Sequence, residues 1–138
     1  MIAIDTNVLL RYLLQDDAAQ SLKATKLLAG RQPVLITDVV LVETLWTLKG
    51  KKYKLPKQDL VTVLSQLMQE PNVVFEDSQT VWTALQSYHT AATGNGVDFA
   101  DTLILAKSQY AIKVKNSLFD GLYTFDADMQ MFKGAKKP

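Results

Sequence analysis

Five acidic side chains stand out because each one follows, or lies within, an apolar segment that could hold it in place. Asp5 and Asp126 each come after a short apolar run, Glu43 lies inside a longer one, and Asp98 and Asp101 open another. Gathered carboxylates repel one another unless a divalent cation neutralises them, and oxygen ligands without Cys or clustered His favour Mg²⁺ or Mn²⁺. The set therefore predicts a metal site of the kind that acts on phosphodiesters, where metal-bound water removes the need for a side-chain nucleophile.

Each of these acids also has a purely structural interpretation. Asp5 could cap the helix that follows it, and Asp126 could be a turn or cap residue. Asp98 and Asp101 are three positions apart on an expected helix, so they share one face in its first turn and could simply offset the helix dipole. Glu43 has almost only apolar neighbours, which leaves little solvated face, so its charge should be bound to a metal or paired with Lys or Arg.

Alternating short strands and longer helices are the elements expected to position these acids. Strands are expected at residues 2–4, 34–36, 73–75 and 122–125. Helices are expected at 8–14, 18–29, 37–49, after Pro56, around 81–88 and at 98–112. Strands separated by helices need crossover connections, which predicts an α/β fold with a mainly parallel central sheet covered on both faces, an α/β/α sandwich. Sites in such folds lie beyond the carboxyl ends of the strands, where Asp5 and Asp126 would stand.

The overall composition limits the remaining possibilities. With 138 residues, 48% of them hydrophobic and 21% charged, the chain has the size and core content of one domain, residues 1–138. It has no cysteine for a disulfide or a zinc–thiolate site, and a net charge of +1 gives no general sign of a polyanion binder. We see neither a secretion signal nor an apolar run long enough to span a membrane, so a cytoplasmic location is expected.

Four motifs in this order resemble the PIN domain family over nearly the whole chain. The segment from Ile2 to Leu10 looks like the opening of these domains, and Glu43 lies where their second acidic residue falls, on the helix after the second strand. The segments from Asp98 to Ala106 and from Thr124 to Asp128 resemble their third and last motifs. The resemblance implies a single PIN-like nuclease domain.

A free-standing domain of this size resembles the toxin half of a VapBC toxin–antitoxin pair. That likeness implies a Mg²⁺-dependent endoribonuclease, with Mn²⁺ as a possible substitute, which forms a homodimer and is inhibited by a small antitoxin protein. It makes Asp5, Glu43 and Asp101 the central metal-site acids and Asp126 the fourth, with Asp98 as a further candidate ligand. By the same likeness, Asn7 and Thr124 would orient the carboxylates without binding the metal. The segment 113–121 is longer than the usual link before the last motif.

Other classes of protein fit the residues less well. A dehalogenase-type phosphatase would need a second Asp two positions after Asp5, where this chain has Asn7. A receiver domain shares the architecture but gives no reason for Glu43 within an apolar helix. The main alternative is a non-catalytic PIN-like module that binds RNA or a protein, which loss of metal-dependent cleavage in an Asp5→Asn variant would distinguish from an enzyme.

Overall fold

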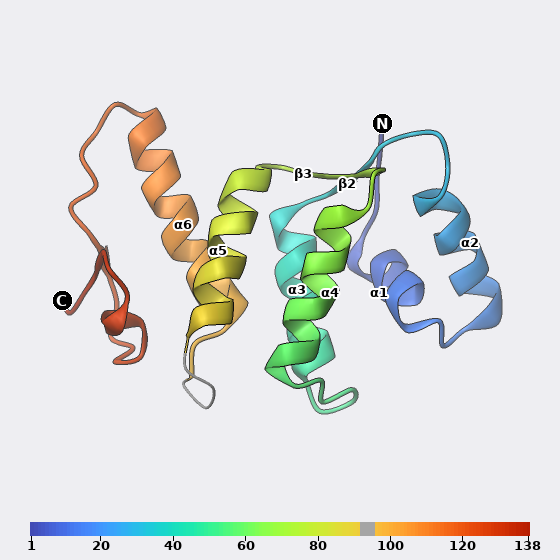
Figure 1. Cartoon of the computed structure of the whole chain (residues 1–138), viewed down its shortest axis with the longest axis horizontal. Helices are drawn as coiled ribbons and strands as arrows, with labels where there is room; N and C mark the ends of the chain where they lie inside the picture. Colours follow the sequence, from blue (N-terminus) through green and yellow to red (C-terminus); the bar gives the residue numbers. More distant parts are fainter. Residues whose placement is uncertain (92–95) are drawn as a thin grey trace. The chain divides into compact units, whose positions relative to one another are not determined.

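Three short apolar runs form a parallel sheet in the computed structural model, which describes residues 1–91 and 96–138. The strands are β1 (Ile2–Ala3), β2 (Val34–Ile36) and β3 (Val73–Phe75), in the order β1-β2-β3 (Figure 1). Ile2 lies opposite Val34, and Val34 lies opposite Val73. The expected α/β class with a parallel sheet is confirmed.

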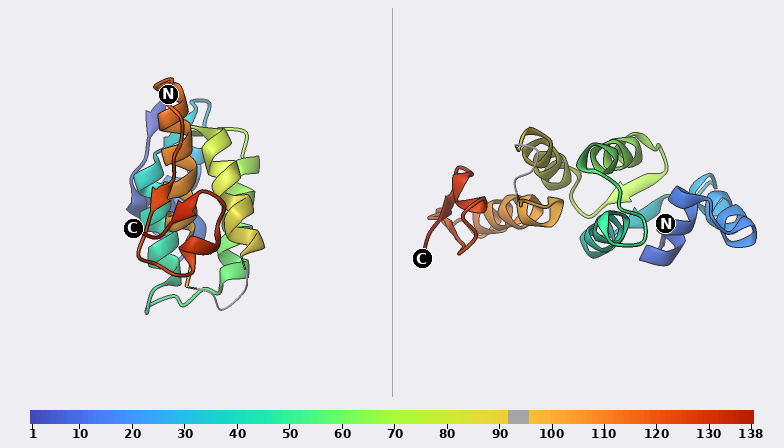
Figure 2. Two further views of the ribbon diagram at one scale, coloured as in Figure 1. Left: turned by 90° about the vertical axis from the view of Figure 1, so that its left-hand side faces the viewer. Right: turned by 90° about the horizontal axis from the view of Figure 1, so that it is seen from below.

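The sheet belongs to the first of two units into which the described chain divides, Met1–Ser78 and Gln79–Pro138. Four helices provide the crossovers between its strands: α1 (Thr6–Leu14) and α2 (Ala18–Leu28) join β1 to β2, and α3 (Asp38–Lys49) and α4 (Lys57–Gln69) join β2 to β3. α1 packs against α2 and α3, and α3 packs against α4 (Figures 1 and 2). The single domain expected for the whole chain stays a prediction.

Side-chain caps fix where the first helices begin. Asp5, Asp17 and Thr37 each accept a hydrogen bond from the backbone N–H three positions later, at the starts of α1, α2 and α3. These bonds satisfy N–H groups that have no partner inside the helix. The core of the unit is formed by fully buried aliphatic side chains on the sheet and helices: Leu9, Val34, Ile36, Leu41, Leu48 and Leu64.

The second unit contains most of α5 (Ser78–Thr90), together with α6 (Phe99–Val114), β4 (Leu122–Tyr123), a short 3₁₀ turn η1 (Met129–Met131) and β5 (Ala135–Lys136). Val97, Leu105 and Met129 form a buried cluster against which Phe119, Leu122 and Phe132 pack. The sequence Gly94-Asn95-Gly96 predicts the end of the helix around residues 81–88, and its first two residues lie outside the described part of the chain. No helix among the described residues is long and apolar enough to cross a membrane.

The last strand differs from the expectation for residues 122–125. β4 ends at Tyr123 and pairs in parallel with β5, which the sequence did not predict, instead of with the three-stranded sheet. The reason is local: the Thr124 hydroxyl accepts a hydrogen bond from the Asp126 N–H at 3.0 Å, which turns the chain after the strand. Asp126 therefore lies in a turn, and its predicted place directly at a strand end was wrong.

Candidate metal centre

Asp5 lies beyond the carboxyl end of β1 and caps α1. Its Oδ1 accepts a hydrogen bond from the Val8 N–H at 2.9 Å, so the structural interpretation of this residue is confirmed. The carboxylate is exposed, and its Oδ2 has no hydrogen-bond partner among the described residues. A carboxylate has about four acceptor positions, so one capping bond leaves Asp5 able to bind a cation.

Glu43 is joined to the residue after Asp5. The Thr6 hydroxyl, in the first turn of α1, donates a hydrogen bond of 2.5 Å to Glu43 Oε2 on α3. Hydrogen bonds to a charged acceptor are short and comparatively strong. The contact therefore ties the Glu43 carboxylate to the start of α1, where Asp5 supplies the cap, and it leaves Oε1 without a partner in the described part of the chain.

The surroundings of Glu43 differ from the sequence prediction. The residue is exposed, and its helix face also exposes Val39 and Trp46, which are 66% and 73% accessible. The expectation that Glu43 has little solvated face was wrong, because a helix that is apolar nearly all round can still leave one face uncovered. A carboxylate that stays hydrated does not have to be paired with a cation. The hydrogen-bond partner of the Glu43 side chain is the Thr6 hydroxyl.

Asp98 and Asp101 meet at the start of α6, as their spacing predicted. The Asp98 N–H donates to Asp101 Oδ2 at 2.8 Å, which closes this end of the helix as in a capping box. Phe99 is buried behind them and makes an edge-on contact with Tyr88, with ring centroids 6.3 Å apart. Burial raises the pKa of the Tyr88 phenol, and the negative charge of Asp98 raises that pKa further.

Asp126 and Asp128 both bind backbone N–H groups near the start of η1. Asp126 Oδ1 accepts from the N–H groups of Asp128 at 2.9 Å and Met129 at 3.4 Å, so its carboxylate satisfies the N–H groups at the start of η1. Asp128 occupies the N-cap position of η1, but its side chain makes no capping bond there: its Oδ2 accepts from the Gly96 N–H at 2.9 Å and fixes the chain just before α6. The Thr124 hydroxyl accepts from the backbone N–H of Asp126 and not from its carboxylate, so the expected role of Thr124 in orienting a carboxylate stays a prediction.

The predicted acids are divided between the two units. The first unit carries Asp5 and Glu43, and the second carries Asp98, Asp101 and Asp126. Within residues 1–91 and 96–138, no three His, Asp or Glu side chains are gathered so that they could hold a metal ion. The donors nevertheless fit a hard cation, because the set is all carboxylate and the chain has no cysteine and one histidine, the exposed His89.

Thr6 is the site residue that the sequence reasoning missed. The residue expected to orient a carboxylate in this segment was Asn7, whose side chain makes no hydrogen bond within the described residues, and its role stays a prediction. The available signal was position: a side chain in the first turn of the helix capped by Asp5 lies close to the strand end, as Asp5 itself does.

Comparison of the sequence with models of known protein families finds a match. The model of the PIN domain matches residues 2–131, which is almost the entire sequence. No curated protein and no solved structure matches the chain at the level of significance applied.

Proposed function

The chain belongs to the PIN domain family, a superfamily of nucleases, and we propose that it is a Mg²⁺-dependent endoribonuclease, the toxin of a VapBC-type toxin–antitoxin pair. The observation that supports this most directly is the hydrogen bond from Thr6 to Glu43, which fixes the second predicted acid to the residue after the first. Asp5 alone caps the start of α1, so the fold gains little from holding the exposed Glu43 carboxylate beside it.

Asp5, Glu43, Asp98 and Asp101 are the residues that would bind the metal directly, with oxygen ligands that suit Mg²⁺ and tolerate Mn²⁺, and Asp126, the fourth predicted acid, would reach it through a water. When bound, the cation polarises a phosphoryl oxygen and lowers the pKa of its water. Asp5 and Glu43 each keep one carboxylate oxygen without a partner in the described residues, so they can bind the cation without giving up the hydrogen bonds that orient them.

Asp126 would act on the water. Its Oδ1 is occupied by two backbone N–H groups, whereas Oδ2 has no partner among the described residues and can accept a proton from the attacking water. Thr124 holds the backbone of Asp126 in this turn.

The proposed partners follow from the family likeness. The substrate is RNA, the protein forms a homodimer, and a small antitoxin blocks the metal site. The alternative function is a PIN-like module that binds RNA or protein without cutting, and the experiment that distinguishes the two also tests the main proposal.

That experiment uses two Asp→Asn variants with the same local geometry. Asp5 and Asp17 both cap a helix in the first unit, and each accepts one backbone N–H at 2.9 Å. Asn is as good a cap as Asp, so the free energy of unfolding of both variants should lie within about 0.5 kcal/mol of the wild-type value. With Mg²⁺, the wild type and Asp17→Asn should cleave RNA, and Asp5→Asn should lose at least about 100-fold in rate, a few kcal/mol of transition-state stabilisation.

The same comparison includes a readout that does not depend on activity. Titration with Mn²⁺, followed by calorimetry, should give clearly weaker binding for Asp5→Asn and unchanged binding for Asp17→Asn. Equal cleavage by both variants, or cleavage that persists in excess chelator, would refute the metal-dependent mechanism. Binding of RNA without any cleavage by the wild type would favour the non-catalytic module.

A further inference from the structure

A groove of about 270 Å³ lies between α1 and α2, next to Asp5. Apolar side chains line part of it, namely Val8 on α1 and Ala24 and Leu27 on α2. Leu27 is 42% exposed although it lines the groove, so it presents apolar surface to whatever occupies this space. The volume lies just below the range of about 300 to 1,000 Å³ typical of small-molecule pockets, which suits one small unit of a longer ligand.

Side chains that carry N–H donors surround this apolar surface. They are Asn7 and Arg11 on α1 and Gln20 and Lys23 on α2. Within the described residues, the side chains of Asn7, Gln20 and Lys23 make no hydrogen bond or ion pair, and Arg11 makes one ion pair, which leaves most of its five donors unused. These donors therefore favour an anionic ligand. An apolar ligand would displace the water bound to the N–H groups and leave them without a hydrogen-bond partner.

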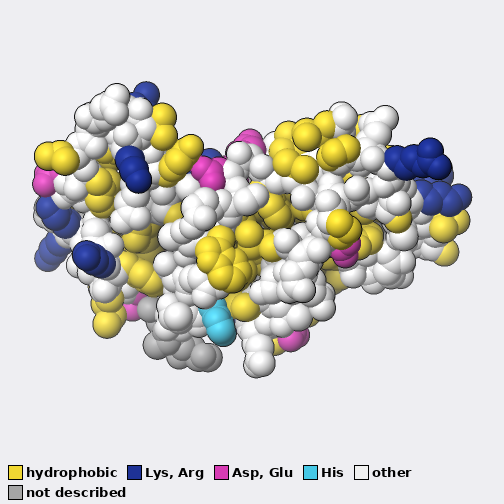
Figure 3. Space-filling view, turned by 45° about the horizontal axis from the view of Figure 1, so that its top comes forward, with side chains coloured by type: hydrophobic (Ala, Val, Ile, Leu, Met, Phe, Trp, Pro, Cys, Tyr) yellow, Lys and Arg dark blue, Asp and Glu magenta, His cyan; other side chains and the backbone are white. Residues whose placement is uncertain are grey.

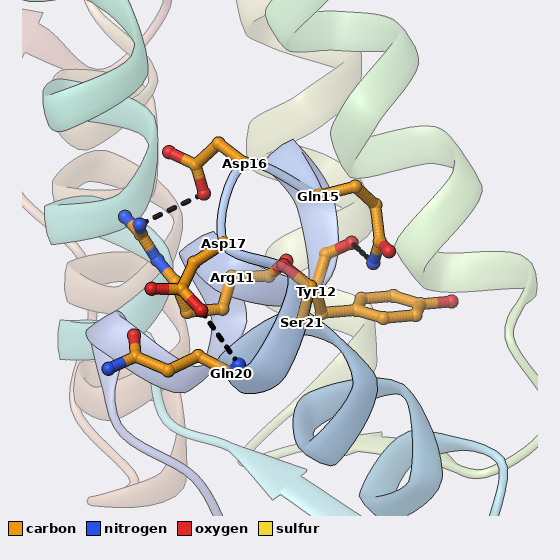
Figure 4. Close-up of polar contacts among 7 residues, drawn as sticks. All are labelled: Arg11, Tyr12, Gln15, Asp16, Asp17, Gln20 and Ser21. Atoms are coloured by element: carbon orange, nitrogen blue, oxygen red, sulfur yellow. Dashed lines mark hydrogen bonds and ion pairs between the residues drawn. The ribbon is translucent and has the colours of Figure 1, made fainter.

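The two helices that form the groove are held together before any ligand binds. Arg11 Nη1 lies 2.9 Å from Asp16 Oδ1, and the Ser21 hydroxyl donates to the Arg11 carbonyl at 2.9 Å. Asp17 caps α2 through the Gln20 N–H, and Figure 4 shows Gln20 and Arg11 on the same side of α1, away from Tyr12. A binding surface fixed in this way loses little conformational entropy when it is occupied.

We propose that this groove binds one nucleotide of the RNA strand next to the phosphate that is cut. The phosphate of that nucleotide lies between Lys23 and Arg11, and its base or ribose covers the apolar side chains. The inference rests on the proposed function, because Asp5, which also lines the groove, places the groove beside the proposed metal site. Among the described residues, Asp5 is the one acid that lines the groove, and a bound cation would neutralise its charge.

Two lysines on α2 provide a matched test. Lys23 lines the groove, whereas Lys26 is exposed on the same helix and does not line it. Figure 3 shows Lys and Arg side chains, in dark blue, at the right of the view and also at its left, so unspecific attraction must be separated from a specific contact. Affinity for a single-stranded RNA oligonucleotide is measured by fluorescence anisotropy at several KCl concentrations in excess chelator, so that no cleavage occurs.

Lys23→Gln should weaken binding by roughly five- to tenfold and reduce the slope of log affinity against log salt by about 0.7, the value for one phosphate contact on a single strand. Lys26→Gln should leave the slope unchanged and the affinity within about twofold, since an exposed charge away from the site contributes little.

Two leucines test the apolar part of the groove in the same way. Leu27 lines it, and Leu22, 56% exposed on the same helix, does not. Leu27→Ser should weaken binding by about threefold, from the loss of partly buried apolar area, and should leave the salt slope as it is. Leu22→Ser should change neither quantity.

The outcomes separate this inference from the proposed function. A wild type that cuts no RNA with Mg²⁺ while the Lys23 and Lys26 variants differ as expected would refute the nuclease and support the groove. A wild type that cuts RNA while both lysine variants bind with equal affinity and equal salt slope would overturn the groove and leave the nuclease standing. Absence of any RNA binding by the wild type would also overturn the groove.

Discussion

Thr6 and Glu43, 37 positions apart in the sequence, are joined by a hydrogen bond of 2.5 Å between the Thr6 hydroxyl and Glu43 Oε2. Thr6 belongs to the first turn of α1, and Glu43 lies in the middle of α3. The bond links the two helices at the level of the strand end, where the cap Asp5 lies. An exposed carboxylate would otherwise sample several rotamers, so the hydroxyl restricts Glu43 to one of them.

Replacing Thr6 with Val should weaken metal binding without unfolding the protein. Val has the shape of Thr and lacks the hydroxyl, so Glu43 loses the donor that orients it, whereas Asp5 still caps α1 through the Val8 N–H. A hydrogen bond to a charged group contributes about 1.5 to 3 kcal/mol. At an exposed site water replaces the lost donor and offsets most of this loss, so we expect the Mn²⁺ affinity to fall by about threefold to tenfold. Calorimetric titration measures this.

Thr6→Ser is the matched control, because it keeps the hydroxyl and should bind Mn²⁺ as the wild type does. Equal affinity in the Val and Ser variants would show that Glu43 needs no orientation by Thr6. A free energy of unfolding more than about 2 kcal/mol lower in the Val variant than in the wild type would show that the bond is mainly structural, since the loss exceeds the contribution of a typical single hydrogen bond.

The sequence predicted the α/β class, three of the strands and the pair of acids on α6, because those features depend on short-range patterns. The alternation of β-branched runs with amphipathic segments needs no knowledge of tertiary contacts. The spacing of Asp98 and Asp101 places them in one turn of any helix.

The exposure of Glu43 and the end of β4 depended on information that the sequence pattern lacks. An apolar helix such as α3 is expected to be buried, but which face stays exposed is decided by what packs against it, and Val39 and Trp46 remain accessible. The pairing of β4 with β5 could not be predicted from a two-residue strand, and the turn at Thr124 is one side-chain hydrogen bond.

Asp126 and Asp128 should affect different properties of the protein. Asp126→Asn should reduce Mg²⁺-dependent cleavage more than Asp128→Asn, and less than Asp5→Asn, because Asn still accepts from the N–H groups at the start of η1 but cannot take a proton from water. Asp128→Ala should lower the free energy of unfolding by about 1 kcal/mol, since the Gly96 N–H loses its acceptor.

Rates at saturating Mg²⁺ and urea unfolding curves measure the two effects separately. A larger loss of cleavage in Asp128→Asn than in Asp126→Asn would show that the wrong acid after β4 has been assigned to the water. In that case the bond from Gly96 to Asp128 would belong to the site and not to the stability of the fold.

Tyr12 should make the protein less stable at high pH. Burial raises the pKa of its phenol above 10.0, and the hydrogen bond of 3.0 Å to Glu70, together with the charge of Glu70, raises it further. A raised pKa means that the folded state holds the proton more tightly than the unfolded chain. This contribution to stability is complete below pH 10 and is lost as the pH rises through the folded-state pKa.

The Tyr12→Phe variant isolates this contribution. At pH 7 it should lose about 0.5 to 1.5 kcal/mol, the value of one hydrogen bond, and above about pH 10 its stability should fall less steeply than that of the wild type. Part of the fall should remain, because burial also raises the pKa of Tyr88. Parallel pH profiles for the two proteins, from urea unfolding between pH 7 and 11, would contradict the assignment.

The protein should self-associate in solution. The helices leave several large apolar side chains accessible, among them Val39, Trp46 and Trp82, and exposed apolar surface of this kind often marks an interface. Light scattering at increasing concentration should report a dimer. A monomer at high concentration would refute the homodimer, and a Trp46→Glu variant that remains dimeric would exclude this face of α3 from the interface.

The antitoxin should inhibit by placing a cation among the carboxylates of the metal site. An Arg guanidinium presents a planar set of donors that can bind carboxylates in a bidentate way, and it would compete for the oxygens of Asp5 and Glu43 that have no partner among the described residues. A short peptide that contains one Arg should therefore inhibit RNA cleavage less as the Mg²⁺ concentration rises. The same peptide with Arg changed to Gln should lose most of its inhibition.

Competition between the peptide's Arg and Mg²⁺ distinguishes this mechanism from one in which the peptide covers the RNA-binding groove. If the peptide only covers the groove between α1 and α2, raising Mg²⁺ should not relieve the inhibition, and Lys23→Gln should change the peptide's effect more than the Arg→Gln change does. If the Arg binds the carboxylates, the apparent inhibition constant should increase by the factor 1 + [Mg²⁺]/Kd, where Kd is the dissociation constant of the metal, because one set of oxygens cannot bind both cations. Inhibition of equal strength by the Arg and Gln peptides would contradict this mechanism, whatever the Mg²⁺ concentration.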